Sequence, residues 1–560
     1  MIPQPATFPS THQESSVFFS SRWLLGLGLL VLTSMAYAEI PAVNSEEVAL
    51  GRRIYMEGIL PSGEPLKGMR QNVVQLEGAT AACETCHRRS GIGSLEANIS
   101  VKPITGAFLF ATDDNRPMAL LDTRAANDIT KPHAPYTEAS LAKAIREGIN
   151  VSGRQMNLLM PHYALSDRDI KALTAYLRQL SSELSPGVGE DTLQFATIIT
   201  PDVDPKKAEV MVRMMHVAFD QRNISQQVYS GRMRSPLDLL PRKLRNWQLK
   251  VWQLTGAPET WAAQLAENYR RNPVFAVISG VSNSTWEPVS QFCEQEKLPC
   301  LLPSVPLPPI KSSFYLRYFS RGVALEADVL ATQLRNKEIK SPQRLLQIYR
   351  NTEVGRGAAQ KLSEDLKGSD VKVEDRILAS TKPADIKALL KGVSSQDVVM
   401  LWLNPADLAA VNKAAPKQVP AVVYVSGFLA DEDYSFVSKA WKSHVRVVYP
   451  YELGEKRQKN ADKMKQWLKT WQLPLVDEPF QNEVFFDLLL ITDLSSQMLD
   501  NFYRDYLVER TEDMLSIGSN VSAYPYLSLS RNQGFASKGA YIAHLDAKGE
   551  LVADTEWLIP

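Results

Sequence analysis

The hydrophobic pattern beyond residue 190 alternates short apolar runs with longer amphipathic stretches. Such apolar runs are typical of buried parallel strands, and apolar positions repeating at three and four are typical of the helices that cover them. The alternation restarts after one long helix, so we predict a two-lobed α/β fold with parallel sheets. The predicted strands are 195–200, 249–254, 274–278, 298–302, 345–349, 371–373, 398–402 and 421–425, and the predicted helices are 204–220, 258–270, 286–296 and 324–335.

Helical spacing marks two segments ahead of residue 184. Ser45 precedes a predicted helix over 46–56, and Ser166-Asp-Arg-Asp169 has the capping-box pattern of a helix start. The second helix carries an apolar stripe at Ile170, Leu173, Tyr176, Leu177 and Leu180. The breaker-rich stretch 185–189 then predicts a linker. We therefore divide the chain into residues 39–184, a linker at 185–190, and residues 191–560.

The first 38 residues have the pattern of an export signal. An apolar run over 23–32 follows Arg22, and Ala36-Tyr37-Ala38 has the small-x-small pattern of a cleavage site. The run is shorter than the roughly 20 residues that span a bilayer, and no later segment is long and apolar enough. We expect cleavage after Ala38 and a periplasmic protein without a stable membrane span, with an uncleaved anchor as the alternative.

Length and charge narrow the function classes. A chain of 560 residues is too long for one compact core and predicts about two to four domains. The 62 basic residues equal the 62 acidic residues, and no basic run or basic–aromatic interleaving is present. Nucleic acid is therefore not an expected partner. No nucleophile–base pair, phosphate loop or metal constellation is visible either, so the sequence favours a carrier or binding protein over an enzyme.

Cys83-Glu84-Thr85-Cys86-His87 is the attachment motif for c-type haem. Two thiols three positions apart lie on one face of a helical turn, where both reach the haem vinyl groups, and the next imidazole becomes the proximal iron ligand. We predict one covalent haem c held by Cys83, Cys86 and His87. A metal knuckle or a redox pair is the alternative.

Residues of about 44–183 resemble class I cytochromes c, which implies an all-α domain. Gly51-Arg-Arg-Ile-Tyr55 is similar to the family's N-terminal helix contact, Tyr176-Leu177 to its C-terminal helix and 136–148 to its middle helix. Met160-Pro161 resembles the axial-methionine loop, so the resemblance implies Met160 as second axial ligand, with Met156 and His162 as alternatives. His/Met ligation suits outer-sphere electron transfer. Arg88 and Arg89 could meet a haem propionate or a partner; a solvated pair is favoured.

The remaining cysteines, Cys293 and Cys300, close a short loop in a protein expected in an oxidising compartment. We therefore predict a disulfide. Zinc is the competing interpretation, but no histidine or third cysteine lies near.

The order of elements in residues 191–560 resembles the type I periplasmic solute-binding proteins of the branched-chain amino acid and amide branch. The resemblance rests on 277–284 as a first ligand loop, 297–304 as the next strand and loop, and 539–560 as a closing hairpin. It implies a small organic ligand such as an amino acid or amide, with Ser279, Ser282 and Ser284 holding a carboxylate at a helix start. Trp286 departs from the family, which has a small residue there.

Three functions follow from these patterns. The first is periplasmic electron transfer through the haem, coupled to a solute-binding-like domain that docks a redox partner protein or binds a small ligand. The second is a ligand receptor or sensor in which the haem is secondary. The third, a haem peroxidase-type enzyme, requires an open iron position and is disfavoured by His87/Met160 ligation.

Overall fold

The computed structural model describes residues 45–71, 73–96, 99–112, 117–119, 133–229, 243–309, 313–335, 344–414, 419–432, 434, 441–516 and 522–560. The predicted signal peptide, 1–38, lies outside these residues. Among the described residues, no helix is both long and apolar enough to cross a bilayer.

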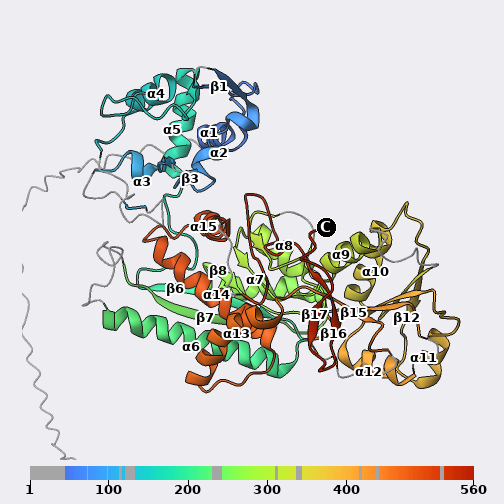
Figure 1. The fold of residues 1–560 in the computed structure, drawn as a ribbon. Helices are drawn as coiled ribbons and strands as arrows, with labels where there is room; N and C mark the ends of the chain where they lie inside the picture. Colours follow the sequence, from blue (N-terminus) through green and yellow to red (C-terminus); the bar gives the residue numbers. More distant parts are fainter. Residues whose placement is uncertain are drawn as a thin grey trace, which may run out of the picture. The chain divides into compact units, whose positions relative to one another are not determined.

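Two helices cross closely in the N-terminal part. They are α1 (Ser45–Glu57) and α5 (Asp167–Gln179), shown in blue and cyan in Figure 1. A Cβ at Gly51 would lie 2.0 Å from the carbonyl oxygen of Ala172, so only glycine fits at the crossing. The rings of Tyr55 and Tyr176 pack beside it, with centroids 5.3 Å apart. The predicted helix contact is confirmed.

The two later helices of this part each begin with a side-chain cap. Ser166 and Asp169 form the predicted capping box at α5, and Thr137 with Ser140 forms a second box at α4 (Glu138–Glu147). Gly148 ends α4 in the left-handed conformation that glycine adopts without strain. Two short helices, α2 (Glu84–His87) and α3 (Gly106–Leu109), complete the helical set of this part in the described residues.

The N-terminal part departs from the expected all-α domain. Strands β2 (Val74–Glu77), β1 (Lys67–Arg70) and β5 (His162–Tyr163) form an antiparallel sheet, and β3 (Ser94–Glu96) pairs with β4 (Ile99–Val101). Strands β3, β4 and β5 follow Cys83, whereas β1 and β2 lie in the long segment between α1 and Cys83. Glycines with positive φ at Gly58, Gly63 and Gly78 reverse the chain there, so its backbone groups pair as strands.

The first sheet of the α/β part is parallel throughout. Its order is β10 (Leu316–Arg317), β9 (Cys300–Leu301), β8 (Ala276–Ile278), β6 (Thr192–Ile199) and β7 (Asn246–Gln253). The predicted strands of this lobe are therefore confirmed. The helices that alternate with these strands are α6 (Pro205–Tyr229), α7 (Trp261–Arg271) and α8 (Glu287–Gln295).

The second sheet has five parallel strands and an antiparallel end. Its order is β12 (Val373–Ile377), β11 (Leu345–Tyr349), β13 (Val398–Trp402), β14 (Val422–Ser426), β15 (Val445–Tyr449), β16 (Tyr541–Leu545) and β17 (Leu551–Ala553). The pair β16–β17 is the predicted closing hairpin. The helices of this lobe are α9 (Val323–Arg335), α10 (Glu353–Asp365), α11 (Pro383–Leu389) and α12 (Pro405–Ala414).

Three further helices, drawn in orange in Figure 1, lie between β15 and β16 in the sequence: α13 (Gly454–Thr470), α14 (Glu478–Gln497) and α15 (Arg504–Ser516). Helix α14 is buried along most of its length and packs against α6. Helix α15 buries Glu509 and Glu512 despite their charge. Both helices position functional residues, as shown below.

Candidate functional site

The haem-attachment motif occupies one helical turn. Cys83 caps α2 and Cys86 lies within it, so both sulfur atoms belong to the same short turn. Neither is in a disulfide. A c-type haem requires two reduced thiols on one turn, so the geometry around Cys83 and Cys86 fits the group.

His87 is held as a neutral imidazole. Its ring is 8% exposed, and Nδ1 lies 2.9 Å from the carbonyl oxygen of Lys102. Burial lowers the pKa of His87 to about 4, so the ring is uncharged at neutral pH. A carbonyl oxygen only accepts, so the proton sits on Nδ1 and the lone pair on Nε2 is left for a metal. A backbone carbonyl fixing the tautomer in this way is usual for a metal-bound histidine.

The structure also places the candidates for the second axial ligand. Met160 is half-buried and packs against the hydrophobic core that contains Cys83. A turn positions it: the Met160 amide donates to the carbonyl of Asn157 at 2.9 Å. Met156 is also half-buried, and its amide donates to the carbonyl of Gly148 at 2.8 Å. The ring of His162 lies against Gly148, where a Cβ would meet its Nε2 at 2.4 Å.

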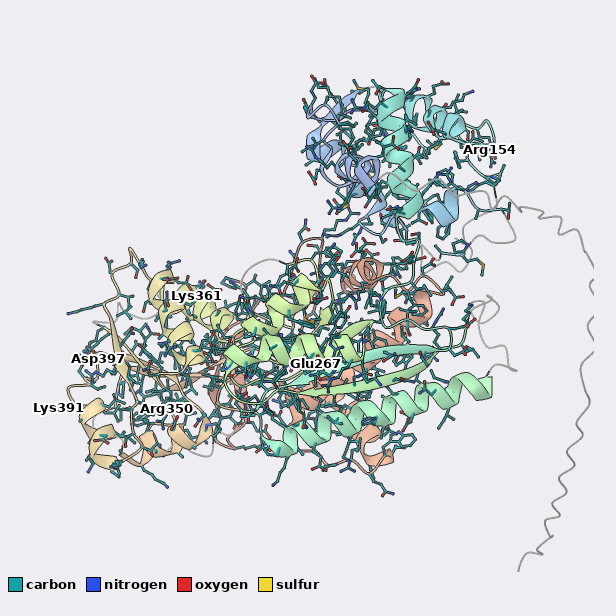
Figure 2. The ribbon with its side chains drawn as sticks, turned by 180° about the vertical axis from the view of Figure 1, so that it is seen from behind. Arg154, Glu267, Arg350, Lys361, Lys391 and Asp397 are labelled. Atoms are coloured by element: carbon teal, nitrogen blue, oxygen red, sulfur yellow. A yellow bond between two sulfur atoms is a disulfide. The ribbon has the colours of Figure 1, made fainter. Side chains whose placement is uncertain are left out.

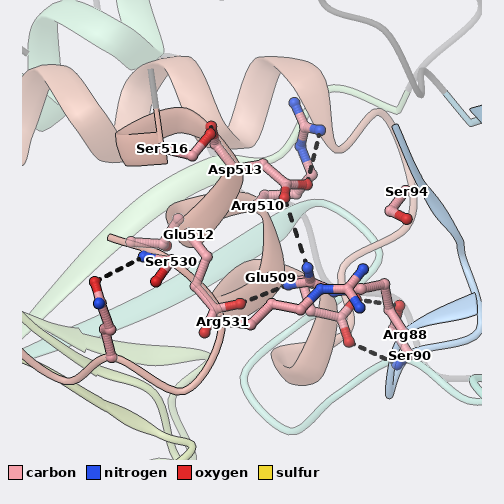
Figure 3. Close-up of polar contacts among 12 residues, drawn as sticks. Arg88, Ser90, Ser94, Glu509, Arg510, Glu512, Asp513, Ser516, Ser530 and Arg531 are labelled. Atoms are coloured by element: carbon pink, nitrogen blue, oxygen red, sulfur yellow. Dashed lines mark hydrogen bonds and ion pairs between the residues drawn. The ribbon is translucent and has the colours of Figure 1, made fainter. Parts of the chain in front are cut away.

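The residues that follow His87 contact the α/β part through α15 (Figure 3). Arg88 donates to Glu512 Oε2 at 2.5 Å, and Arg317 in β10 donates to Oε1 of the same carboxylate at 2.5 Å. Ser90 donates to Glu509 twice, from its amide at 2.8 Å and its hydroxyl at 2.6 Å. We call residues 88–90 the haem loop. Glu512 and Glu509 of α15 thus bind Arg88 and Ser90 of this loop.

The expectation that Arg88 and Arg89 are solvated is wrong for Arg88. Arg88 is 6% exposed and ion-paired, and its carbonyl accepts a 2.6 Å hydrogen bond from Tyr55 in α1. Arg89 is half-buried; its guanidinium lies 4.4 Å from the centre of the Phe314 ring and 3.4 Å from Asp505. Sequence reasoning missed this interface because the partner carboxylates resemble the surface charges of an ordinary helix.

Cys293 in α8 and Cys300 in β9 form a disulfide in the structure, as the sequence predicts. Both residues are buried in the core of the first lobe. No group of three or more His, Cys, Asp or Glu side chains that could hold a metal ion occurs within the described ranges.

Only two of the three predicted ligand serines line a cavity. Ser282 and Ser284 lie on the wall of a cavity of about 580 Å³ between the lobes. Ser279 does not; it is 3% exposed, and its hydroxyl donates to Asp487 in α14 at 2.6 Å. Ser279 therefore lies behind the cavity wall, and a buried carboxylate already accepts the hydrogen bond of its hydroxyl. Trp286 is buried in the lobe core behind this loop.

Comparisons with known proteins give matches to two kinds of protein. Residues 77–181, which include the attachment motif and Met160, match the family model described as cytochrome c. No curated protein matches the chain.

Solved structures similar to part of the chain include several that are described as substrate-binding or transporter proteins. They include a fatty acid ABC transporter substrate-binding protein from Thermomonospora curvata, with 13% identity over 68% of this chain and 95% of that one and a TM-score of 0.48. A leucine-binding protein from Thermotoga maritima is 10% identical; the match covers 66% of this chain and 99% of that chain, with a TM-score of 0.48. A branched-chain amino acid ABC transporter from Thermus thermophilus with bound valine is 9% identical; the match covers 66% of this chain and 97% of that chain, with a TM-score of 0.49.

Proposed function

We propose that the protein is an exported electron-transfer protein in which one covalent haem c is joined to a domain that binds a small organic ligand. The haem domain is residues 39–184 and the ligand domain residues 191–560, with Cys83 and Cys86 as attachment sites. A periplasmic redox protein exchanges electrons with the haem. Cleavage after Ala38 leaves the mature chain in the periplasm.

The geometry of His87 is the observation that carries this proposal. A neutral buried ring, tied by Nδ1 to the Lys102 carbonyl, leaves Nε2 unprotonated on a residue that belongs to the same helical turn as the two thiols. Iron held by imidazole and thioether exchanges electrons without binding a substrate. Met160 supplies the thioether, because it packs in the same core as Cys83, whereas His162 lies against Gly148.

Optical spectra of the mature, haem-loaded protein test the ligation. We expect the near-infrared sulfur-to-iron band in the oxidised wild type, its loss in Met160→Ala and its survival in the matched control Met156→Ala. The ferrous wild type should not bind carbon monoxide, because both axial positions are filled. A band that survives Met160→Ala would assign the position to another residue, and carbon monoxide binding by the wild type would favour a peroxidase-type site.

A further inference from the structure

The cavity between the lobes lies at the carboxyl ends of both parallel sheets. Its walls come from the loops after β6, β8 and β9 in one lobe and after β11, β13 and β14 in the other, together with the start of α14. Ligands of open parallel sheets bind at this edge. The volume of about 580 Å³ suits a small molecule. The side chains on these walls determine which molecule fits.

The loop expected to hold a ligand carboxylate is already hydrogen-bonded within the chain. The amide of Asn283 donates to Asp202 Oδ2 at 3.1 Å, and the Asn283 side-chain amide donates to the Asp202 carbonyl at 3.0 Å. The Ser282 hydroxyl donates to the Thr285 carbonyl and accepts from the Ser284 amide. The Asp202 carboxylate thus already accepts the hydrogen bond of the Asn283 amide, in the loop that we expected to hold a ligand carboxylate.

Four helix starts at the cavity are capped by the chain's own side chains. Asp204 accepts from an amide of α6 at 2.7 Å, and Thr352 from an amide of α10 at 3.2 Å. Asn404 accepts from an amide of α12 at 2.9 Å, and Asp477 from an amide of α14 at 3.0 Å. Helix starts attract anions through their unpaired amides. These caps, two of them carboxylates, remove that attraction.

The charge of the lining also opposes an anion. The cavity is lined by eight carboxylates and two basic side chains, Lys207 and Arg350 (Arg350 is labelled in Figure 2). Both basic side chains already form ion pairs within the chain. Lys207 lies 2.6 Å from Asp477, and Arg350 binds Asp407 through two nitrogens at 2.9 and 2.6 Å. An incoming carboxylate would therefore find negative charge and no unpaired basic group among the described lining residues.

Glu483 gives a second, independent indication of the ligand. It lines the cavity from α14 and is 2% exposed. Oε1 accepts a 2.7 Å hydrogen bond from Tyr524, and the nearby Ser304 hydroxyl also acts to lower the pKa of the carboxyl, whereas Oε2 is buried and accepts no hydrogen bond of normal geometry in the part of the chain that the structure describes. A buried carboxylate oxygen requires a donor. Burial raises the pKa of Glu483 to about 7, although the hydroxyls of Tyr524 and Ser304 and the charge of Lys207 act to lower it.

Aromatic side chains complete the lining. Trp402, Phe428, Tyr451 and Phe480 border the same cavity. Phe428 and Tyr451 stack with centroids 6.5 Å apart. Aromatic faces attract organic cations, and their apolar surface accommodates an alkyl chain.

We propose that the cavity binds a protonated alkylamine, a small organic cation without a carboxylate, whose N–H donates to Glu483 Oε2 while its alkyl chain packs on the aromatic wall. This assignment rests on the proposed ligand-binding role of the α/β part and names the ligand class of that site. It differs from the amino acid or amide that the sequence led us to expect, because Asp202 already accepts the hydrogen bond of the Asn283 amide.

Calorimetric titration of the haem-loaded full chain tests the assignment with three probes: butylammonium chloride, 1-butanol and valine. We expect saturable binding of butylammonium only. Glu483→Gln keeps an acceptor for Tyr524 and should weaken butylammonium binding at least about tenfold, the loss expected for one charge-assisted hydrogen bond. The matched control Glu353→Gln, an exposed acid of the same wall, should change binding less than about threefold.

The wild-type comparison needs no variant, so a poorly folding Glu483→Gln leaves the test intact. Valine binding without butylammonium binding would overturn the ligand class and keep the ligand-binding role. Binding of neither would overturn both, and equal binding of butylammonium and 1-butanol would show that charge is not recognised. An unchanged affinity in folded Glu483→Gln would also overturn the assignment. The haem half of the proposed function is judged separately by the optical spectra.

Discussion

Replacing Glu512 with glutamine should separate the two parts of the chain. The Glu512 carboxylate lies between two guanidiniums, with Arg88 Nη2 and Arg317 Nη2 each 2.5 Å away. The Glu512 side chain is 4% exposed, and the Arg88 and Arg317 side chains are 7% and 1% exposed. Glu512→Gln keeps the shape and removes the charge that holds both cations.

The magnitude follows from burial. Removing one partner of a buried ion pair costs about 3–5 kcal/mol, because the remaining charge is left without compensation. Here two guanidiniums lose a shared partner, although Arg88 keeps a weaker contact with Asp513 at 3.7 Å. We therefore expect a loss of about 3–5 kcal/mol in the free energy that couples the two parts.

Two optical probes report the parts separately. Residues 44–183 contain no tryptophan, so tryptophan fluorescence follows the α/β part and the Soret band follows the haem part. Urea unfolding of the wild type should give coincident transitions, and Glu512→Gln should move the Soret transition to lower urea, apart from the fluorescence transition. The matched control is Asp513→Asn, on the same helix but with a side chain that is 32% exposed. It should change the free energy of unfolding measured by either probe by less than about 1 kcal/mol. Equal effects of the two substitutions would refute the reasoning.

Two further predictions concern the same region. Burial raises the pKa of Glu509 from its ordinary 4.5 to about 8, although the nearby charge of Arg88 acts to lower it. Between pH 4.5 and pH 8 the folded protein therefore keeps a proton on Glu509 that the unfolded chain has lost. The free energy of unfolding should therefore fall as pH rises from about 4.5 to 8, by up to about 1.4 kcal/mol per unit, and urea titrations of Glu509→Gln should show a weaker dependence; an identical slope would contradict this. Gly51→Ala places a Cβ 2.0 Å from the Ala172 carbonyl oxygen, so it should destabilise the haem part by about 1–3 kcal/mol or more, although alanine has the better helix propensity. The Soret transition in urea measures this loss. A variant as stable as the wild type would show that α1 and α5 do not cross as described.

The elements that the sequence predicted well are those with a strong local signal. Strands β11 and β13 have the predicted bounds, because each is an apolar run buried along its whole length. The start of α5 follows from the Ser166–Asp169 capping box, which is a local interaction. The short sheet β2-β1-β5 was missed because its strands are polar and partly exposed, so they lack an apolar alternation.

The site residues divide in the same way. Cys83, Cys86 and His87 could be found because their function fixes their spacing within one turn. The surroundings of Arg88 and Ser279 could not, because their carboxylate partners lie 424 and 208 residues away in the sequence. A buried arginine and a solvated one have the same local pattern, and only tertiary packing distinguishes them. The same holds for Asp202, whose carboxylate changes the kind of ligand that the cavity favours.

Helices α14 and α15 show what these long-range contacts achieve. Helix α14 brings Glu483 to the wall of the cavity, and a turn of a few residues leads into α15, which brings Glu509 and Glu512 to the haem loop. All three carboxylates are buried, and the sequence alone does not distinguish them from surface acids. Since buried charge is costly without a partner, such residues mark positions where another group is bound. One stretch of chain thus carries the buried acid of the cavity at one end and, at the other, Glu512, the counter-charge of Arg88.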